Sequence, residues 1–187
     1  MRVSREQAER NREHVVETAA RLFRERGYDG IGVADLMKEA GLTHGGFYGN
    51  FKSKEQLMAE ACAHAFKAAE ERWQRVIARD GDRAMDSIAD AYLSQRHVDQ
   101  PGVGCAAAAL GADIARLAPS VRAAMTAGVQ AHIAQLAPLL DDDPDAGRAR
   151  AIADYAAMVG ALVLARAVND ATLSNEILAT VRQRIGT

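Results

Sequence analysis

Apolar residues recur every three or four positions along most of this chain, and this period limits its fold more than any other feature. In the first segment the recurring residues are Val15, Val16, Ala19, Leu22 and Phe23, which would share one face of an α-helix. A half-buried strand would instead place apolar residues at alternate positions. The chain also holds 39 alanines against 4 prolines, the best and the worst helix formers. The sequence therefore predicts an all-α protein.

Glycines, prolines and capping residues divide this pattern into nine expected helices. Gly27 and Gly41 follow the first two apolar segments, as expected for left-handed C-terminal caps. Ser53, with Gln56 three residues later, is a capping box that starts a long helix, and Pro138 is expected to shorten or kink a later one. The expected helices cover 5–26, 33–40, 44–50, 54–79, 82–97, 105–117, 119–140, 144–168 and 173–185. We divide them into an N-terminal three-helix domain, 1–53, and a C-terminal six-helix domain, 54–187.

Charge, cysteine content and hydropathy exclude several classes of protein. Lys and Arg number 23 against 25 Asp and Glu, a formal net charge of −2, so a polybasic nucleic-acid coat protein is excluded. Residues 1–55 hold ten basic and nine acidic side chains, which leaves room for a small basic patch. Cys62 and Cys105 are too few for a disulfide framework and suit a reducing compartment. With no signal peptide and no apolar run of ~20 residues, the expected location is cytoplasmic and away from membranes.

No constellation of residues in the sequence indicates an enzyme. Paired carboxylates beside a histidine, a G-x-S-x-G motif and a glycine-rich phosphate loop are all missing, as is any His, Cys and carboxylate cluster with metal-ligand spacing. We therefore expect no catalytic activity, no cofactor and no metal. A helical ligand-binding protein without DNA function remains an alternative, but it would have no use for the polar segment 43–54.

The second and third short segments have the arrangement of a helix-turn-helix. An amphipathic helix over 33–40 is followed by the Gly41 turn and a short helix over 44–50, the position of a recognition helix that enters the DNA major groove. Phe47 and Phe51 would point inward, while the outward positions are small or can form hydrogen bonds. The expected core of this domain consists of Leu22, Phe23, Val33, Leu36, Phe47 and Phe51.

Six short strings follow one another in the first 57 residues: AARLF at 19–23, GY at 27–28, VADL at 33–36, AGLT at 40–43, FYGNF at 47–51 and SKEQL at 53–57. In this order and spacing, residues 12–57 resemble the DNA-binding domain of the TetR family of bacterial transcription regulators. The resemblance implies a repressor that binds double-stranded operator DNA and is released by a small-molecule effector. It also implies a homodimer formed through the last two helices.

The resemblance assigns DNA contacts to residues in and around the recognition helix. Thr43 would bond a phosphate or cap the helix, His44 would read bases, and the Tyr48 hydroxyl would contact a phosphate. The ammonium of Lys54 would hold a phosphate at the start of the next helix, and two adjacent glycines would allow close backbone approach. The expected DNA-binding residues are Thr43, His44, Gly45, Gly46, Tyr48, Asn50 and Lys54.

One residue of this region departs from the family pattern, and two other features affect how the region would bind DNA. Relatives often carry a histidine where this chain has Asn50, which can bond a phosphate or cap the helix. With two glycines on the recognition helix few side chains can read bases, so DNA shape and water would carry much of the specificity. Arg2 and Arg5 form a short basic arm that could reach phosphate or the minor groove.

The middle helices are expected to enclose the effector in a mainly apolar pocket. The candidate residues are Phe66, Trp73, Tyr92, Cys105, Met125, His132, Tyr155 and Met158. Cys105 follows a Pro-Gly-Val-Gly segment and opens a helix, a position that favours the thiolate form. Some TetR-like regulators have a similar Gly-Cys pair, and a few of those sense electrophiles. The alternative function is therefore a thiol-based redox or electrophile sensor, against the simpler interpretation of Cys105 as a small buried residue.

Overall fold

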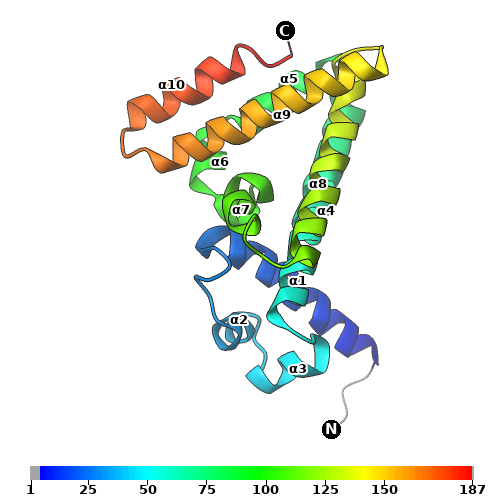
Figure 1. Cartoon of the computed structure of the whole chain (residues 1–187), viewed down its shortest axis with the longest axis vertical. Helices are drawn as coiled ribbons and strands as arrows, with labels where there is room; N and C mark the ends of the chain where they lie inside the picture. The colour runs from blue at the N-terminus through cyan, green and yellow to red at the C-terminus, as the bar shows by residue number, and fades with distance from the viewer. Residues whose placement is uncertain (1–4, 187) are drawn as a thin grey trace.

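A computed structural model describes residues 5–186, all of whose regular elements are helical, which confirms the prediction of an all-α protein. Ten α-helices are joined by short turns (Figure 1). They are α1 Arg5–Arg26, α2 Val33–Glu39, α3 Phe47–Asn50, α4 Lys54–Asp80, α5 Ala84–Tyr92, α6 Gln95–Asp99, α7 Ala106–Ile114, α8 Pro119–Leu136, α9 Pro144–Ala167 and α10 Ala171–Arg182. Four 3-10 turns complete the elements: η1 His44–Gly46, η2 Gly81–Arg83, η3 Pro101–Val103 and η4 Ala137–Leu139.

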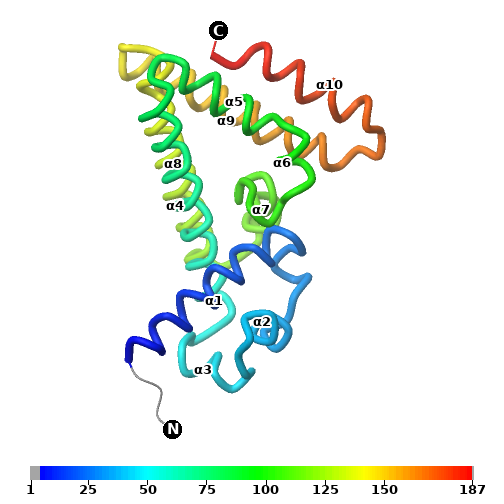
Figure 2. Tube along the Cα trace, turned by 180° about the vertical axis from the view of Figure 1, so that it is seen from behind, coloured from blue at the N-terminus to red at the C-terminus, as the bar shows by residue number. Residues whose placement is uncertain are grey.

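The helices form an elongated molecule with a different group at each end. Helices α1, α2 and α3 lie at one end, and α9 and α10 lie side by side at the other (Figures 1 and 2). The long helices α4 and α8 pack along each other and connect the two ends, while α7 and η3 rest on α1. A displacement of α4 or of η3 would therefore be transmitted to the N-terminal helices.

The hydrophobic core consists of two clusters. The first contains every buried apolar side chain from Val15 to Phe66, together with Ala106, Leu110, Ile114 and Val121 from α7 and α8. The second runs from Trp73 to Ile185 and fills the space between α4, α5, α8, α9 and α10. The boundary predicted at residue 53 coincides with the start of α4, but the first core continues across it because the first turns of α4 pack on α1.

Several local predictions are confirmed. Gly27 and Gly41 adopt the left-handed conformation, with φ of 75° and 69°. The Ser53 hydroxyl accepts a hydrogen bond from the Gln56 N–H at 3.2 Å and starts α4. Pro138 lies in η4, where α8 gives way to a 3-10 turn, as its missing N–H requires.

The single helix predicted over 82–97 is wrong. The structure has two, α5 and α6, because the backbone leaves the helical region at Leu93 and the Ser94 hydroxyl then caps α6 by accepting from the His97 N–H. Asp82, the first residue of the predicted helix, lies inside the 3-10 turn η2. The recognition segment also begins as the 3-10 turn η1 before α3, which is consistent with the weak helix propensity of its two glycines.

Of the two residues of the predicted basic arm, the structure describes Arg5 alone. Arg2 falls outside the described residues. Arg5 opens α1, and its guanidinium pairs with Glu9 one turn later at 3.1 Å.

Candidate nucleic-acid interface and internal cavity

The recognition segment is held by two phenylalanines and presents one tyrosine outward. Phe47 and Phe51 are buried, with ring centroids 5.5 Å apart, and they anchor η1 and α3 in the first core. Tyr48 lies between them in sequence, and its side chain is 70% exposed. Tyr48 is therefore the large aromatic side chain that this segment presents on its outer face.

Small and polar residues surround Tyr48 on this face. Thr43 and His44 are exposed, Thr43 makes no side-chain capping bond, and the His44 ring packs edge-on to Tyr48 at 5.8 Å. A Cβ added at Gly45 or Gly49 would meet no atom within 4 Å. The protein's own packing therefore does not require glycine at these two positions. The close approach of another molecule to the backbone would require it.

Asn50 and Lys54 are engaged within the protein. The Asn50 side-chain amide donates to the Gly46 carbonyl at 2.7 Å, which ties the end of α3 back to η1. The Lys54 ammonium donates to the Tyr28 carbonyl at 2.6 Å and keeps two further N–H groups for other acceptors. Gly46 is partly buried, and a Cβ there would make only ordinary contacts with Met37 and Thr43 at 3.7 Å. Sequence reasoning passed over Lys52, whose exposed side chain adjoins this face.

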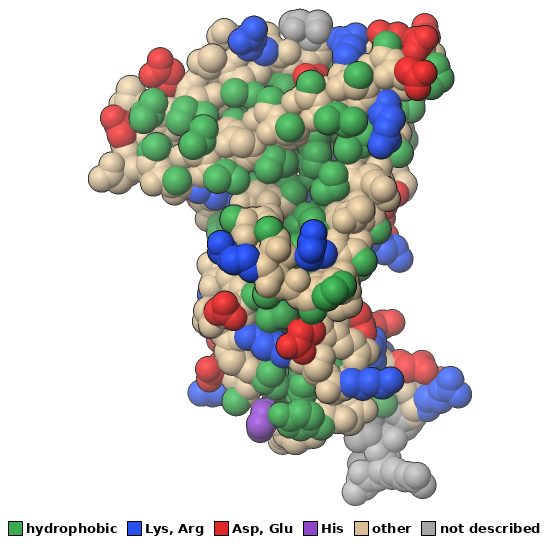
Figure 3. All heavy atoms as spheres, viewed as in Figure 1, with side chains coloured by type: hydrophobic (Ala, Val, Ile, Leu, Met, Phe, Trp, Pro, Cys, Tyr) green, Lys and Arg blue, Asp and Glu red, His purple; other side chains and the backbone are tan. Residues whose placement is uncertain are grey.

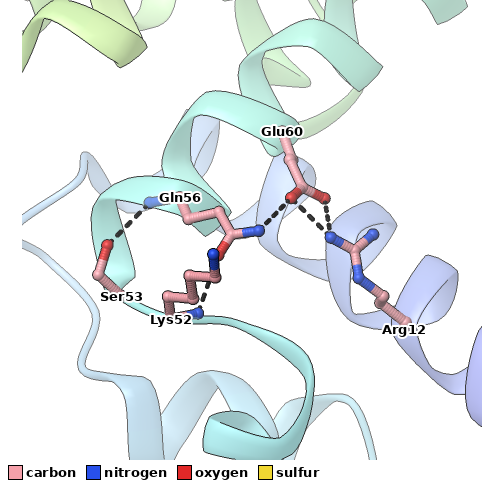
Figure 4. Close-up of polar contacts among 5 residues, drawn as sticks. All are labelled: Arg12, Lys52, Ser53, Gln56 and Glu60. Atoms are coloured by element: carbon pink, nitrogen blue, oxygen red, sulfur yellow. Dashed lines mark hydrogen bonds and ion pairs between the residues drawn. The ribbon is translucent and has the colours of Figure 1, made fainter.

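A polar network joins the recognition segment to α1 and α4 (Figure 4). The Arg12 guanidinium binds both carboxylate oxygens of Glu60, at 2.6 and 2.7 Å, and lies over the Phe51 ring at 4.8 Å. The Gln56 amide donates to Glu60 at 3.0 Å, and its oxygen accepts from the Lys52 backbone N–H at 2.8 Å. In a usual capping box the Gln side chain accepts from the backbone N–H of the cap residue itself. Here it accepts from Lys52, one residue before the cap residue Ser53. The chain entering α4 is thereby fixed relative to α1.

A cavity of about 610 Å³ opens between α4, α5, α6 and η3, within the range of small-molecule sites. Four of the eight predicted effector residues line it: Trp73, Tyr92, Cys105 and His132. Its other lining residues are Ala69, Arg72, Val76, Ile88, Ala91, Ser94, Arg96, His97, Gln100, Val103 and Gly104. Sequence reasoning missed Arg72, Arg96 and His97 because charged and polar residues on a helix resemble an ordinary solvated surface.

The other four predicted residues lie behind the cavity wall or away from it. The Tyr155 hydroxyl is 3.1 Å from His132 Nδ1 and 3.6 Å from the Cys105 sulfur, so it orients two lining residues. Phe66 packs on the His132 ring at a centroid distance of 5.0 Å. Met158 is fully buried in the second core, and Met125 packs against the first.

Histidine 97 joins the walls of the cavity. Its Nε2 accepts from the Cys105 backbone N–H at 2.9 Å, so its Nδ1 carries the proton and donates to the Tyr92 carbonyl at 2.7 Å. Burial lowers the pKa of His97 to about 4, which keeps the ring neutral and suited to this double role at neutral pH. A Cβ at Gly104 would lie 2.6 Å from His97 Nε2, so this turn requires glycine.

Burial favours the neutral forms of His132, Tyr92 and Tyr155. It lowers the pKa of His132 to about 4 and raises the pKa of Tyr92 and of Tyr155 well above that of a free tyrosine. His132 stacks on Trp73 with ring centroids 4.3 Å apart. His132, Tyr92 and Tyr155 are thus uncharged at neutral pH.

An exposed apolar stripe runs along α9. Ile152, Val163 and Leu164 are exposed, with Leu164 at 55%, and Leu173 continues the stripe on α10. Figure 3 shows hydrophobic side chains gathered over these two helices at the end of the molecule opposite the recognition segment. Ala161, Leu178 and Ile185 are instead buried within one chain. Ala161 on α9, Leu178 on α10 and Ile185 after the end of α10 face the second core.

Two further properties concern residues 5–186. No helix there is long and apolar enough to cross a membrane. No group of three or more His, Cys, Asp or Glu side chains is placed there to hold a metal ion.

Comparisons with known proteins agree with this geometry. The family model described as "Bacterial regulatory proteins, tetR family" matches residues 15–61. The chain is 30% identical over 135 residues to the HTH-type transcriptional repressor NemR of Escherichia coli, covering 70% of this chain and 67% of NemR. It is 28% identical over 190 residues to an uncharacterized HTH-type transcriptional regulator of Mycobacterium tuberculosis, covering 92% of this chain and 97% of that protein. The crystal structure of reduced E. coli NemR has the same fold, with a TM-score of 0.79, 24% identity and coverage of 93% and 94%.

Proposed function

Because the chain belongs to the TetR family of bacterial transcription regulators, we propose that it is a repressor that binds operator DNA as a homodimer and is released when a small molecule enters the cavity. Members of this family regulate transcription and are not enzymes, as the sequence predicts for this chain. The proposal rests above all on the recognition segment, where a rigid, buried anchor presents Tyr48 and a glycine-lined face to the outside.

The exposed side chains of the segment divide into two roles on DNA. Thr43, Tyr48 and Lys54 can donate hydrogen bonds. On DNA they would bind backbone phosphates and so position the protein on the duplex. His44 would reach base edges from the start of η1, while Gly45 and Gly46 bring the backbone close to the groove. Asn50 would act indirectly, by holding η1 and α3 together through the Gly46 carbonyl.

The stripe on α9 and α10 supports a homodimer. It presents Ile152, Val163, Leu164 and Leu173 to the outside, in a family whose members act as dimers. Two recognition helices can bind successive major grooves only when they are ~34–36 Å apart. A dimer formed at the far end of each subunit would set this separation through α4 and α8.

The cavity supports control by an effector. It lies between α4 and η3, both of which pack against α1, so a change in its width would reach the recognition segment by two routes. An effector shifts the balance only when it binds the DNA-free arrangement more tightly than the DNA-bound one. We expect it to bind against Trp73, Tyr92, Cys105 and His132, with Phe66, Tyr155, Met125 and Met158 supporting the surrounding structure.

A second candidate is a thiol sensor based on Cys105. Its sulfur lines the cavity and lies 3.6 Å from the Tyr155 hydroxyl, which in turn contacts His132. Cys62 provides an internal control, since burial raises its pKa to about 11. Iodoacetamide forms an S–C bond with a thiolate and releases iodide. Peptide mass spectrometry should show faster alkylation of Cys105 than of Cys62; equal or slower alkylation of Cys105 would reject the thiol sensor and leave the effector model intact.

The DNA-binding function is tested by selecting binding sites from random duplex DNA with purified protein. We expect a palindromic site, with affinity that decreases as salt increases. Tyr48→Phe removes one hydroxyl from an exposed ring and should weaken binding about threefold to tenfold with unchanged thermal stability. Gln74→Glu, an exposed change on α4 far from the recognition segment, is the control. Selection of no sequence from the library would contradict the proposal.

A further inference from the structure

The rim of the cavity is positively charged and lacks counter-charges. Arg72 from α4 and Arg96 from α6 line it, and no Asp or Glu is among the described residues that do so. Neither guanidinium forms an ion pair within residues 5–186; Arg72 donates to the Val103 carbonyl at 3.3 Å and Arg96 to the Gln100 amide oxygen at 3.5 Å. Both side chains are exposed. They can therefore turn toward an incoming anion at the loss of only one long hydrogen bond to a neutral acceptor each.

The inner wall is apolar but carries two polar atoms without partners. Trp73, Val76 and Ile88 supply apolar surface. His132 is 1% exposed and Tyr92 is 5% exposed, yet neither His132 Nε2 nor the Tyr92 hydroxyl has a hydrogen-bond partner. Unpartnered polar atoms in a buried position are rare because each costs about 1–3 kcal/mol. A ligand that fills the cavity would be able to satisfy both atoms.

The positive charge at the rim also reaches the inner wall. Burial is the main cause of the lowered pKa of His132 and of His97, and the charge of Arg72 lowers both further. The neighbouring Arg75 in turn lowers the pKa of Arg72. The same positive charge that disfavours protonation of these histidines attracts an anion.

These observations extend the effector model, on which the following inference rests. We infer that the cavity takes a small apolar acid, with an aliphatic or aromatic body against Trp73 and Ile88 and a single carboxylate held at the rim by Arg72 and Arg96. A planar guanidinium matches a carboxylate through two parallel hydrogen bonds. The volume of the cavity accommodates such a molecule, and the mainly apolar inner wall disfavours one with several charges.

The inference is tested with pairs of probes that differ only in charge. Octanoate and 4-phenylbutyrate are titrated against their neutral amides on the whole protein without DNA. Trp73 is the sole tryptophan and lines the cavity, so its fluorescence reports occupancy. We expect each acid to bind at least about tenfold more tightly than its amide. Arg72→Gln and Arg96→Gln should each remove most of this preference, while Arg122→Gln, an exposed change on α8 outside the lining, should retain it.

Three results would overturn the inference: an amide that binds as tightly as its acid, a preference that survives in both Arg72→Gln and Arg96→Gln, or no change of Trp73 fluorescence with any probe. The DNA-binding function is measured separately, by the selection of binding sites. Binding of the acids without selection of DNA would contradict the repressor and leave the ligand class standing. Selection of DNA without discrimination between acid and amide would support the repressor and contradict the ligand class.

Discussion

The Arg24 guanidinium donates two hydrogen bonds to the backbone carbonyl of Gly102, which ties the last turns of α1 to η3 beside the cavity. The bond from Nε measures 3.0 Å, and the other comes from one of the terminal nitrogens. Burial lowers the pKa of Arg24 to about 10, which still leaves it charged at neutral pH. A Cβ at Gly102 would overlap the Glu25 carboxylate and lie 3.0 Å from Arg21 Cγ, so a larger residue would have to displace these side chains of α1. This contact is a direct connection between the cavity wall and the DNA-binding helices.

Arg24→Gln should uncouple the effector from DNA release. The variant loses a charged donor to Gly102 and should be destabilised by about 1–3 kcal/mol. It should retain DNA binding, while the decrease in affinity caused by an effector becomes several-fold smaller in a fluorescence-anisotropy titration. Arg26→Gln, whose native partner is the exposed Glu39, is the control and should respond normally. An undiminished effector response in Arg24→Gln would exclude the η3 route.

Gly45→Ala should weaken DNA binding while leaving the fold intact. A Cβ there meets no protein atom within 4 Å, and alanine is the better helix former, so the thermal midpoint should stay the same or increase. Affinity for the selected site should decrease about tenfold or more because the added methyl group keeps the backbone away from the groove. Gly111→Ala, equally open but inside α7, should leave DNA affinity unchanged while the thermal midpoint stays the same or increases. Full affinity in Gly45→Ala would show that the backbone does not approach DNA at this position.

Gly128→Ala should destabilise the packing of α8 against α4. A Cβ at Gly128 would overlap the ring of Phe66, which is itself buried and packed on His132. Overpacking of this kind typically costs about 1–3 kcal/mol. Urea denaturation followed by circular dichroism measures the loss, again with Gly111→Ala as the control. A midpoint equal to that of the wild type would mean that the two helices separate freely.

Leu164→Glu should convert the dimer into a monomer. Leu164 is the most exposed large apolar residue on α9, and a dimer through this stripe would place two added carboxylates in a shared apolar interface. Sedimentation velocity should show a monomer with unchanged helicity, and DNA affinity should decrease because the two half-sites are no longer bound together. Gln74→Glu should remain dimeric. A dimeric Leu164→Glu would place the interface elsewhere.

Stability should decrease between pH 6.5 and pH 4 in part because of His132. Its pKa is lowered to about 4 in the folded protein, so the unfolded chain takes up a proton first as the pH falls. The stabilisation is complete above pH 6.5 and is lost progressively toward pH 4. Between pH 7 and pH 5 this one group accounts for about 2 kcal/mol. His132→Gln should reduce the difference in unfolding free energy between these two pH values by that amount. An unchanged difference would show that His132 has the same pKa in the folded and the unfolded protein.

Much of the fold could be predicted because it depends on local sequence. Gly27, Gly41 and Ser53 act within a few residues of themselves, through backbone conformation and capping, and each ends or begins a helix as predicted. The break at Leu93 and Ser94 was missed because nothing in the composition of that segment competes visibly with a continuous helix. The burial of Leu93 and the contacts of His97 decide where the helix ends.

The sequence alone determined that the chain is helical, that it has a TetR-like recognition segment, and that Trp73, Tyr92, Cys105 and His132 are candidates for one site. Only the tertiary structure decided what completes that site. Arg72 reaches the cavity from α4, Arg96 and His97 reach it from α6, and Arg24 reaches Gly102 across 78 residues of chain. Periodicity records which face of a helix is apolar. It carries no information on which polar side chains two distant helices bring together, because that depends on how the helices cross.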